Sequence, residues 1–197
     1  MDITPASWQY WCYAALALFA TMAIDADLRE RRIPNLLVLC TALAGVALHA
    51  LGPANERQGM FGYFPGALGA GQSLLGMIVG LLMFLPLYAL RAMGAGDVKF
   101  MAALGTFTGP AQALDLGLLV LVSGGVLALA LMLIRGKTRV VMRNLRLIAH
   151  ARTGGGAQGF DPATQTAERM PYALAFGMGL LAYGYWRHLG HAPILSF

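Results

Sequence analysis

The chain has 197 residues, of which 58% are hydrophobic and only 12% are charged. A water-soluble domain carries about 25% charged residues, so this composition excludes an ordinary soluble fold and makes the lipid bilayer the expected solvent. The formal net charge is +5. We expect no nucleic-acid partner, because the basic cluster has no aromatic residues near it on which bases could stack.

Charge-free stretches follow one another along the chain, and a helix needs about 20 apolar residues to cross the hydrocarbon core. They cover residues 3–24, 33–55, 58–90, 100–114, 116–134 and 170–186. The sequence therefore predicts an all-α integral membrane protein, a single membrane-embedded domain over residues 1–197 with a bundle of about six transmembrane helices. The fourth stretch is short and polar, so we expect it to lie against protein rather than lipid.

The first stretch follows Asp2 rather than basic residues, which favours a retained helix over a cleaved secretory signal. The two cysteines, Cys12 and Cys40, each lie inside a predicted helix. They form neither a disulfide framework nor a CxxC zinc pair, so we expect both to be packing residues. The histidines form no HExxH arrangement, and we expect no metal and no cofactor.

The orientation follows from the basic residues, which are retained in cytoplasmic loops. All but two of the 14 lysines and arginines fall in loops on one side, and the exceptions are Arg57 and Arg187. That side is predicted to be cytoplasmic, with both termini outside. It includes residues 135–169, a basic cytoplasmic loop. Its first half is either a solvated loop or a basic amphipathic helix at the lipid headgroups, and its glycine-rich second half is a flexible loop.

Acidic residues near membrane helices are costly to place and are the first candidates for function. Those at the ends of predicted helices are Asp25, Asp27, Glu30 and Asp97. The others are expected in solvated loops or at the amino terminus: Asp2, Glu56, Asp115, Asp161 and Glu168. On a regular helix Asp25 points roughly 200° away from Asp27, so the two do not face one cavity.

Asp97 lies in the run Gly94-Ala95-Gly96-Asp97-Val98-Lys99. Glycines let the backbone turn and let another helix or an extended substrate come close. The alternative is that Asp97 only caps the next helix. Lys99, beside it, either acts at the site or anchors the chain at the cytoplasmic face.

Asp27 opens the run Asp27-Leu28-Arg29-Glu30-Arg31-Arg32-Ile33-Pro34-Asn35. Pro34 suits the first turn of the second helix. The alternative for Asp27 is an interfacial acid paired with the three arginines. Glu30 is expected to form a local ion pair with those arginines.

Together the two runs resemble the signature motifs of the type IV prepilin peptidases, and residues 170–175 resemble the start of that family's last helix. The resemblance implies an aspartic endopeptidase with Asp27 and Asp97 as its catalytic pair and without metal or cofactor. It implies prepilin or pseudopilin substrates, whose basic leader is cut at the cytoplasmic face of the bacterial inner membrane, in contact with lipid. Supporting motif residues are Arg29, Pro34, Asn35, Gly94, Gly96 and Lys99.

The layout is most similar to the short peptidases of tight-adherence (Flp-type) pili. Longer relatives carry an amino-terminal extension linked to methylation, often with CxxC pairs, whereas here seven residues precede Trp8. We therefore expect cleavage without methyltransferase activity. Two alternatives stay open: a small transporter that uses the same acids as an ion relay, and a non-catalytic scaffold protein of a pilus machine. Presenilin-type proteases share Gly-x-Gly-Asp, but their other motif is Tyr-Asp, and Ala26 precedes Asp27 here.

Overall fold

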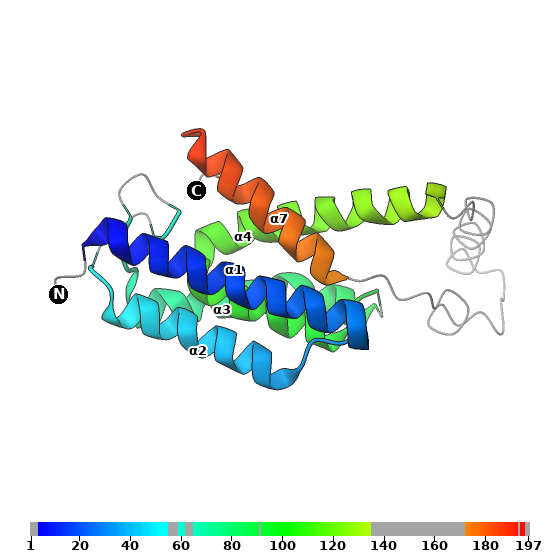
Figure 1. Ribbon diagram of the computed structural model, residues 1–197, viewed down its shortest axis with the longest axis horizontal. Helices are drawn as coiled ribbons and strands as arrows, with labels where there is room; N and C mark the ends of the chain where they lie inside the picture. Colours follow the sequence, from blue (N-terminus) through cyan, green and yellow to red (C-terminus); the bar gives the residue numbers. More distant parts are fainter. Residues whose placement is uncertain are drawn as a thin grey trace.

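The computed structural model describes residues 4–54, 59–61, 65–90, 92–134, 172–192 and 194–195. Within these residues the secondary structure is helical, apart from one isolated bridge between Ala54 and Ala67. The helices are α1 (Pro5–Glu30), α2 (Asn35–Leu51), α3 (Gly69–Ala89), α4 (Ala95–Ile134) and α7 (Tyr172–His188) (Figure 1). The all-α class is confirmed. The predicted basic loop, residues 135–169, lies outside the described residues.

The surface of the bundle is apolar. Helices α1, α3 and α4 are long and apolar enough to cross a membrane, and α2 is a shorter apolar helix. Large side chains such as Leu36 on α2 and Leu82 on α3 are exposed. So extensive an exposed apolar surface is expected where lipid, rather than water, surrounds a protein. The described residues therefore fit a membrane protein, but three candidate spans do not confirm the predicted count of about six.

Helix α4 reverses its direction at Gly109, which has a φ of 75° and is followed by Pro110. Proline has no N–H to donate, and the positive φ suits glycine, so the helical hydrogen bonding stops here. Before the break, the backbone at Gly105 contacts Gly76 of α3; after it, Gly117 lies against Met83, further along α3. The segments 95–108 and 110–134 therefore run in opposite directions, where two helices, 100–114 and 116–134, were predicted.

The predicted boundary between those two helices was wrong because it relied on Asp115 as a loop residue. Asp115 is fully buried within α4. Its carboxylate accepts hydrogen bonds from the backbone N–H groups of Ile194, at 3.1 Å, and Leu195, at 2.8 Å. These contacts tie the segment after α7 to the bundle. The break lies at Gly109, so the helix has already resumed at Asp115.

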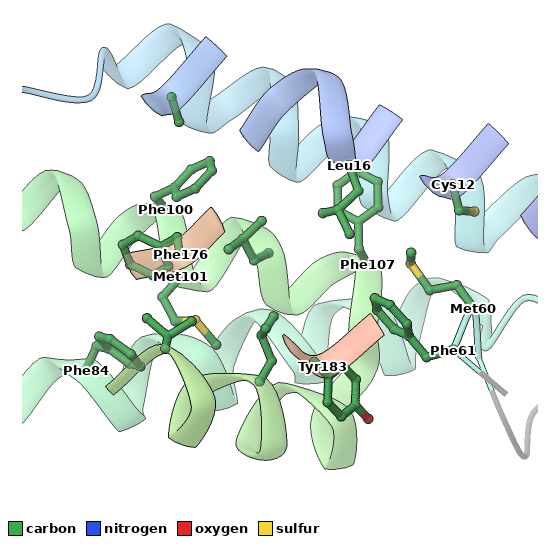
Figure 2. Close-up of a cluster of buried hydrophobic side chains, with 14 of the residues drawn as sticks. Cys12, Leu16, Met60, Phe61, Phe84, Phe100, Met101, Phe107, Phe176 and Tyr183 are labelled. Carbon is green, nitrogen blue, oxygen red and sulfur yellow. The ribbon is translucent and has the colours of Figure 1, made fainter. Parts of the chain in front are cut away.

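Aromatic side chains join α7 to the other helices (Figure 2). The ring of Phe176 packs edge-on against Phe100 of α4, with centroids 5.4 Å apart, and lies 6.0 Å from Phe84 of α3. All three rings are fully buried. Cys12 is also buried, as expected of a packing residue, whereas Cys40 is exposed on α2 and was predicted wrongly.

His49 holds the reversal of α4 in place. Its Nδ1 accepts the N–H of Leu68 at 3.0 Å, so Nε2 carries the proton and donates it to the carbonyl oxygen of Phe107 at 2.7 Å. The ring is buried and links α2 to the turn before α3 and to the end of the first α4 segment. Phe107 is fully buried and Leu68 is partly buried, so the carbonyl of Phe107 would otherwise be buried without a partner, at a cost of about 1–3 kcal/mol.

Replacing His49 by alanine is expected to lower the free energy of unfolding by about 2–4 kcal/mol, because it leaves the buried carbonyl of Phe107 and the partly buried N–H of Leu68 unpaired. Thermal unfolding of the purified protein in detergent would measure the loss. Cys40→Ala, an exposed change on the same helix, is the control and should unfold like the wild type. Equal midpoints for the two variants would show that the histidine does not stabilise the reversal.

Candidate active site

Asp27 lies in the last turn of α1 and is 7% exposed. Its Oδ2 accepts the backbone N–H of Ala173, the second residue of α7, at 3.0 Å. The first N–H groups of a helix have no partner within that helix, and the positive end of the helix dipole favours an anion. Asp27 is thus held by the amino terminus of α7. The alternative of an interfacial acid paired with arginines is wrong.

The neighbouring acids occupy that interfacial role instead. Arg29 pairs with Asp25 at 2.7 Å and Arg32 pairs with Glu30 at 3.2 Å, and all four side chains are exposed. Asp25 therefore points away from the buried Asp27, and Glu30 forms a local ion pair; both predictions are confirmed. Arg29 contacts Asp25 on this exposed face.

Asp97 is the third residue of α4, and its Oδ2 accepts the N–H of Gly94 at 3.3 Å. The contact satisfies a donor just before the helix, as a capping side chain does, but Asp97 does not start the helix as that alternative predicted, because α4 begins at Ala95. The Asp97 carboxyl is also close enough to Asp27 for the two charges to repel each other. Asp97 therefore binds the N–H before α4 and also lies near Asp27.

The two sequence motifs meet at this end of the bundle. A Cβ at Gly96 would lie 3.6 Å from the backbone nitrogen and oxygen of Ile33, an ordinary van der Waals distance, so the two runs lie in contact here. The ammonium of Lys99 donates to Oδ1 of Asn35 at 3.2 Å. Pro34 stands immediately before α2, one position earlier than predicted. The Gly94-to-Lys99 run thus lies directly against the Asp27-to-Asn35 run.

Tyr172 was not singled out from the sequence. Its hydroxyl donates to the carbonyl oxygen of Ala92 at 3.1 Å. The hydroxyl is also near enough to Asp97 to be affected by the charge of that carboxyl group. The only local signal was its place at the start of the last apolar stretch. Ala173 binds Asp27 through its backbone N–H. The identity of a side chain does not indicate such a contact.

The arrangement offers two carboxyl groups from different helices at one end of the bundle, near enough for their charges to repel each other. In the described part of the chain, no group of three or more His, Cys, Asp or Glu side chains is placed to hold a metal ion. Two neighbouring carboxyl groups can take up one proton and release another, which is what general acid–base chemistry requires. The fold and site therefore define an apolar helical protein with a paired-carboxylate centre.

The chain belongs to the type IV leader peptidase family, whose sequence model matches residues 11–132, more than half of the chain. The match includes Asp27 and Asp97 and confirms the resemblance drawn from their motifs. It ends before α7, so the likeness at residues 170–175 lies outside it. The protein is accordingly a peptidase, and its apolar helices indicate a membrane protein. Searches of curated proteins and of solved structures found no match.

Proposed function

We propose that the protein is a membrane-embedded aspartic endopeptidase that removes the basic leader from type IV or Flp-type prepilins and pseudopilins. The observation that carries this proposal is the meeting of Asp27 and Asp97, from the two family motifs, at the junction of α1, α4 and α7. Family membership favours a peptidase over the ion relay or the scaffold protein.

In this mechanism the two carboxyl groups act as a pair. One, ionised, takes a proton from a water molecule that attacks the scissile carbonyl carbon. The other, protonated, donates its proton to the carbonyl oxygen. When the C–N bond breaks, the first carboxyl passes the proton taken from water to the leaving amine, and the second takes back a proton from the tetrahedral hydroxyl, which restores the starting pair. Two neighbouring carboxyl groups do not both ionise easily, so the pair holds one proton between its members. We assign the two roles to the pair of Asp27 and Asp97 together.

The proposed cleavage takes place at the cytoplasmic face of the bacterial inner membrane. Support comes from the basic residues that surround the Asp27 motif, since such residues are retained on that side. A prepilin carries a basic leader on the cytoplasmic side, followed by an apolar helix, and the bond to be cut lies at their junction. We further propose cleavage without methylation, because Cys12 and Cys40 form no CxxC pair.

The purified protein, reconstituted in liposomes with a prepilin, tests this function. Mass spectrometry of the product should find a new amino terminus at the junction between the basic leader and the apolar helix. A prepilin with an altered residue at the cleavage point serves as the control for specificity. Failure to cut several prepilins that carry such leaders would contradict the proposal.

Replacing Tyr172 by phenylalanine is expected to reduce processing about fivefold, because a net hydrogen bond of about 1 kcal/mol is lost. That bond holds Ala92, close in the chain to the Gly94 N–H that contacts Asp97. Initial rates of prepilin cleavage would measure the change. Tyr10→Phe, at an exposed position of α1, should leave the rate unaltered. If Tyr172→Phe cleaves prepilin at the same rate as Tyr10→Phe, the hydroxyl of Tyr172 does not position the site.

A further inference from the structure

An apolar groove with a volume of about 540 Å³ lies between α1 and α7. Ala17, Thr21 and Ile24 line it from α1, and Gly177, Leu181 and Gly184 line it from α7. The hydroxyl of Thr21 is bonded to carbonyl groups of its own helix. The groove therefore presents an essentially apolar face to an occupant.

One end of the groove lies about one helical turn from Asp27. Ile24 lies about one helical turn before Asp27 on α1, and Gly177 lies about one turn after Ala173, whose N–H binds Asp27. A Cβ at Gly177 would lie 2.8 Å from Cδ1 of Ile24, so the side chain of Ile24 contacts α7 at this end of the groove. Further from the aspartates, α7 leaves α1 at an angle (Figure 1). A chain held at the aspartates therefore reaches the groove after about one helical turn, past Ile24 and Gly177.

The residues that line the groove are unlike those on the other exposed faces. The exposed sides of α2 and α3 carry large side chains such as Leu39, Leu43 and Ile78. The groove is also lined by large side chains, among them Leu181 and Tyr185, but in addition it contains Ala17, Thr21 and two glycines. Small residues are typical of surfaces on which membrane helices pack closely, because they let two backbones approach. This composition favours a helix over a lipid chain as the occupant.

The length of the groove matches about half of a membrane crossing. Its lining residues extend from Tyr13 to Ile24 on α1 and from Gly177 to His188 on α7. At 1.5 Å per residue, each of these helical stretches is about 16 Å long, and the hydrocarbon core is about 30 Å thick. Three turns of a second helix can therefore lie in the groove, beginning about one turn from Asp27.

We propose that this groove binds the apolar helix of the prepilin, with its first three turns between α1 and α7 and the scissile bond beside Asp27 and Asp97. This inference rests on the proposed peptidase function and assigns the surface that recognises the substrate. The groove selects for an apolar helix that directly follows the cleavage point. The leader, on the other side of the scissile bond, does not enter it.

Filling the groove tests the proposal. Ala17→Phe and Gly184→Leu place side chains in the groove, and each is expected to slow processing of the full-length prepilin at least tenfold. A soluble peptide that contains the leader and the cleavage point, but not the apolar helix, should be cut at the wild-type rate by both variants. The matched controls are Leu18→Phe and Ala182→Leu, at exposed positions of the same helices outside the groove lining. Both should process the full-length prepilin normally.

The outcomes separate the two proposals. If the wild-type protein cuts neither substrate, the peptidase function fails, and the groove assignment fails with it. If the wild type cuts both and the filled variants process the full-length prepilin like the controls, only the groove assignment is wrong. An equal loss on both substrates would also overturn it, since the substitutions would then act on the aspartate pair itself.

Crosslinking gives a second readout that does not depend on activity. Leu181 is exposed in the groove, and Leu39 is exposed on α2. In a Cys40→Ala background, Leu181→Cys is expected to form a disulfide with a cysteine placed in the first three turns of the prepilin's apolar helix. Leu39→Cys should not. Equal crosslinking at the two positions would contradict the proposed binding surface.

Discussion

Replacing Asp27 or Asp97 by asparagine is expected to slow prepilin processing by about 10²- to 10⁴-fold, because each change removes one member of the acid–base pair. Asparagine keeps the shape of the side chain, and its amide oxygen can still accept the N–H of Ala173 or of Gly94. The variants should therefore accumulate in the membrane. Co-expression with a prepilin, followed by an immunoblot that separates the precursor from the mature form, measures the effect.

The matched control is Asp25→Asn. Asp25 lies two residues from Asp27, but its carboxylate is exposed and pairs with Arg29. An exposed ion pair contributes about 0–1 kcal/mol, so this variant should fold and process prepilin nearly as well as the wild type. Normal processing by Asp27→Asn or Asp97→Asn would rule out the proposed pair. A comparable loss in Asp25→Asn would show that charge near this end of α1, rather than the pair, controls activity.

Replacing Gly105 by alanine is expected to destabilise the protein by about 3 kcal/mol or more, at the upper end of the usual cost of overpacking. The added Cβ would overlap the backbone of Gly76 on α3, and a backbone cannot rotate aside as a side chain can. The loss should appear as a lower unfolding temperature in detergent and a lower yield of membrane-inserted protein. Gly76→Ala should behave similarly, because its Cβ would meet the carbonyl of Gly105.

Gly125→Ala provides the control on the same helix. Nothing lies within 4 Å of a Cβ at Gly125, and alanine favours a helix over glycine by about 0.5–1 kcal/mol. This variant should be as stable as the wild type or slightly more so. If Gly105→Ala were equally stable, α3 and the first segment of α4 would not pack as closely as the structure shows.

Composition and local pattern were enough to predict several features of the protein. The scarcity of charge predicted an apolar helical protein, because a chain with so little charge and such long apolar stretches is stable in lipid but not in water. The helical repeat placed Asp25 and Asp27 on different faces, and the structure confirms this. The two aspartate motifs predicted the family, which the match over residues 11–132 confirms. These features are determined by residues that lie close together in the sequence.

Contacts between distant residues were decided by the tertiary structure. Asp115 looked like a loop acid but is buried, because Gly109 turns α4 back and brings residues 194–195 to its carboxylate. The partner of Asp27 is a backbone N–H of α7, a group that every residue except proline possesses. The apolar stretches indicated which segments form helices. How α1 and α7 meet beside the aspartates and then separate depends on packing across the whole bundle, which a local pattern does not encode.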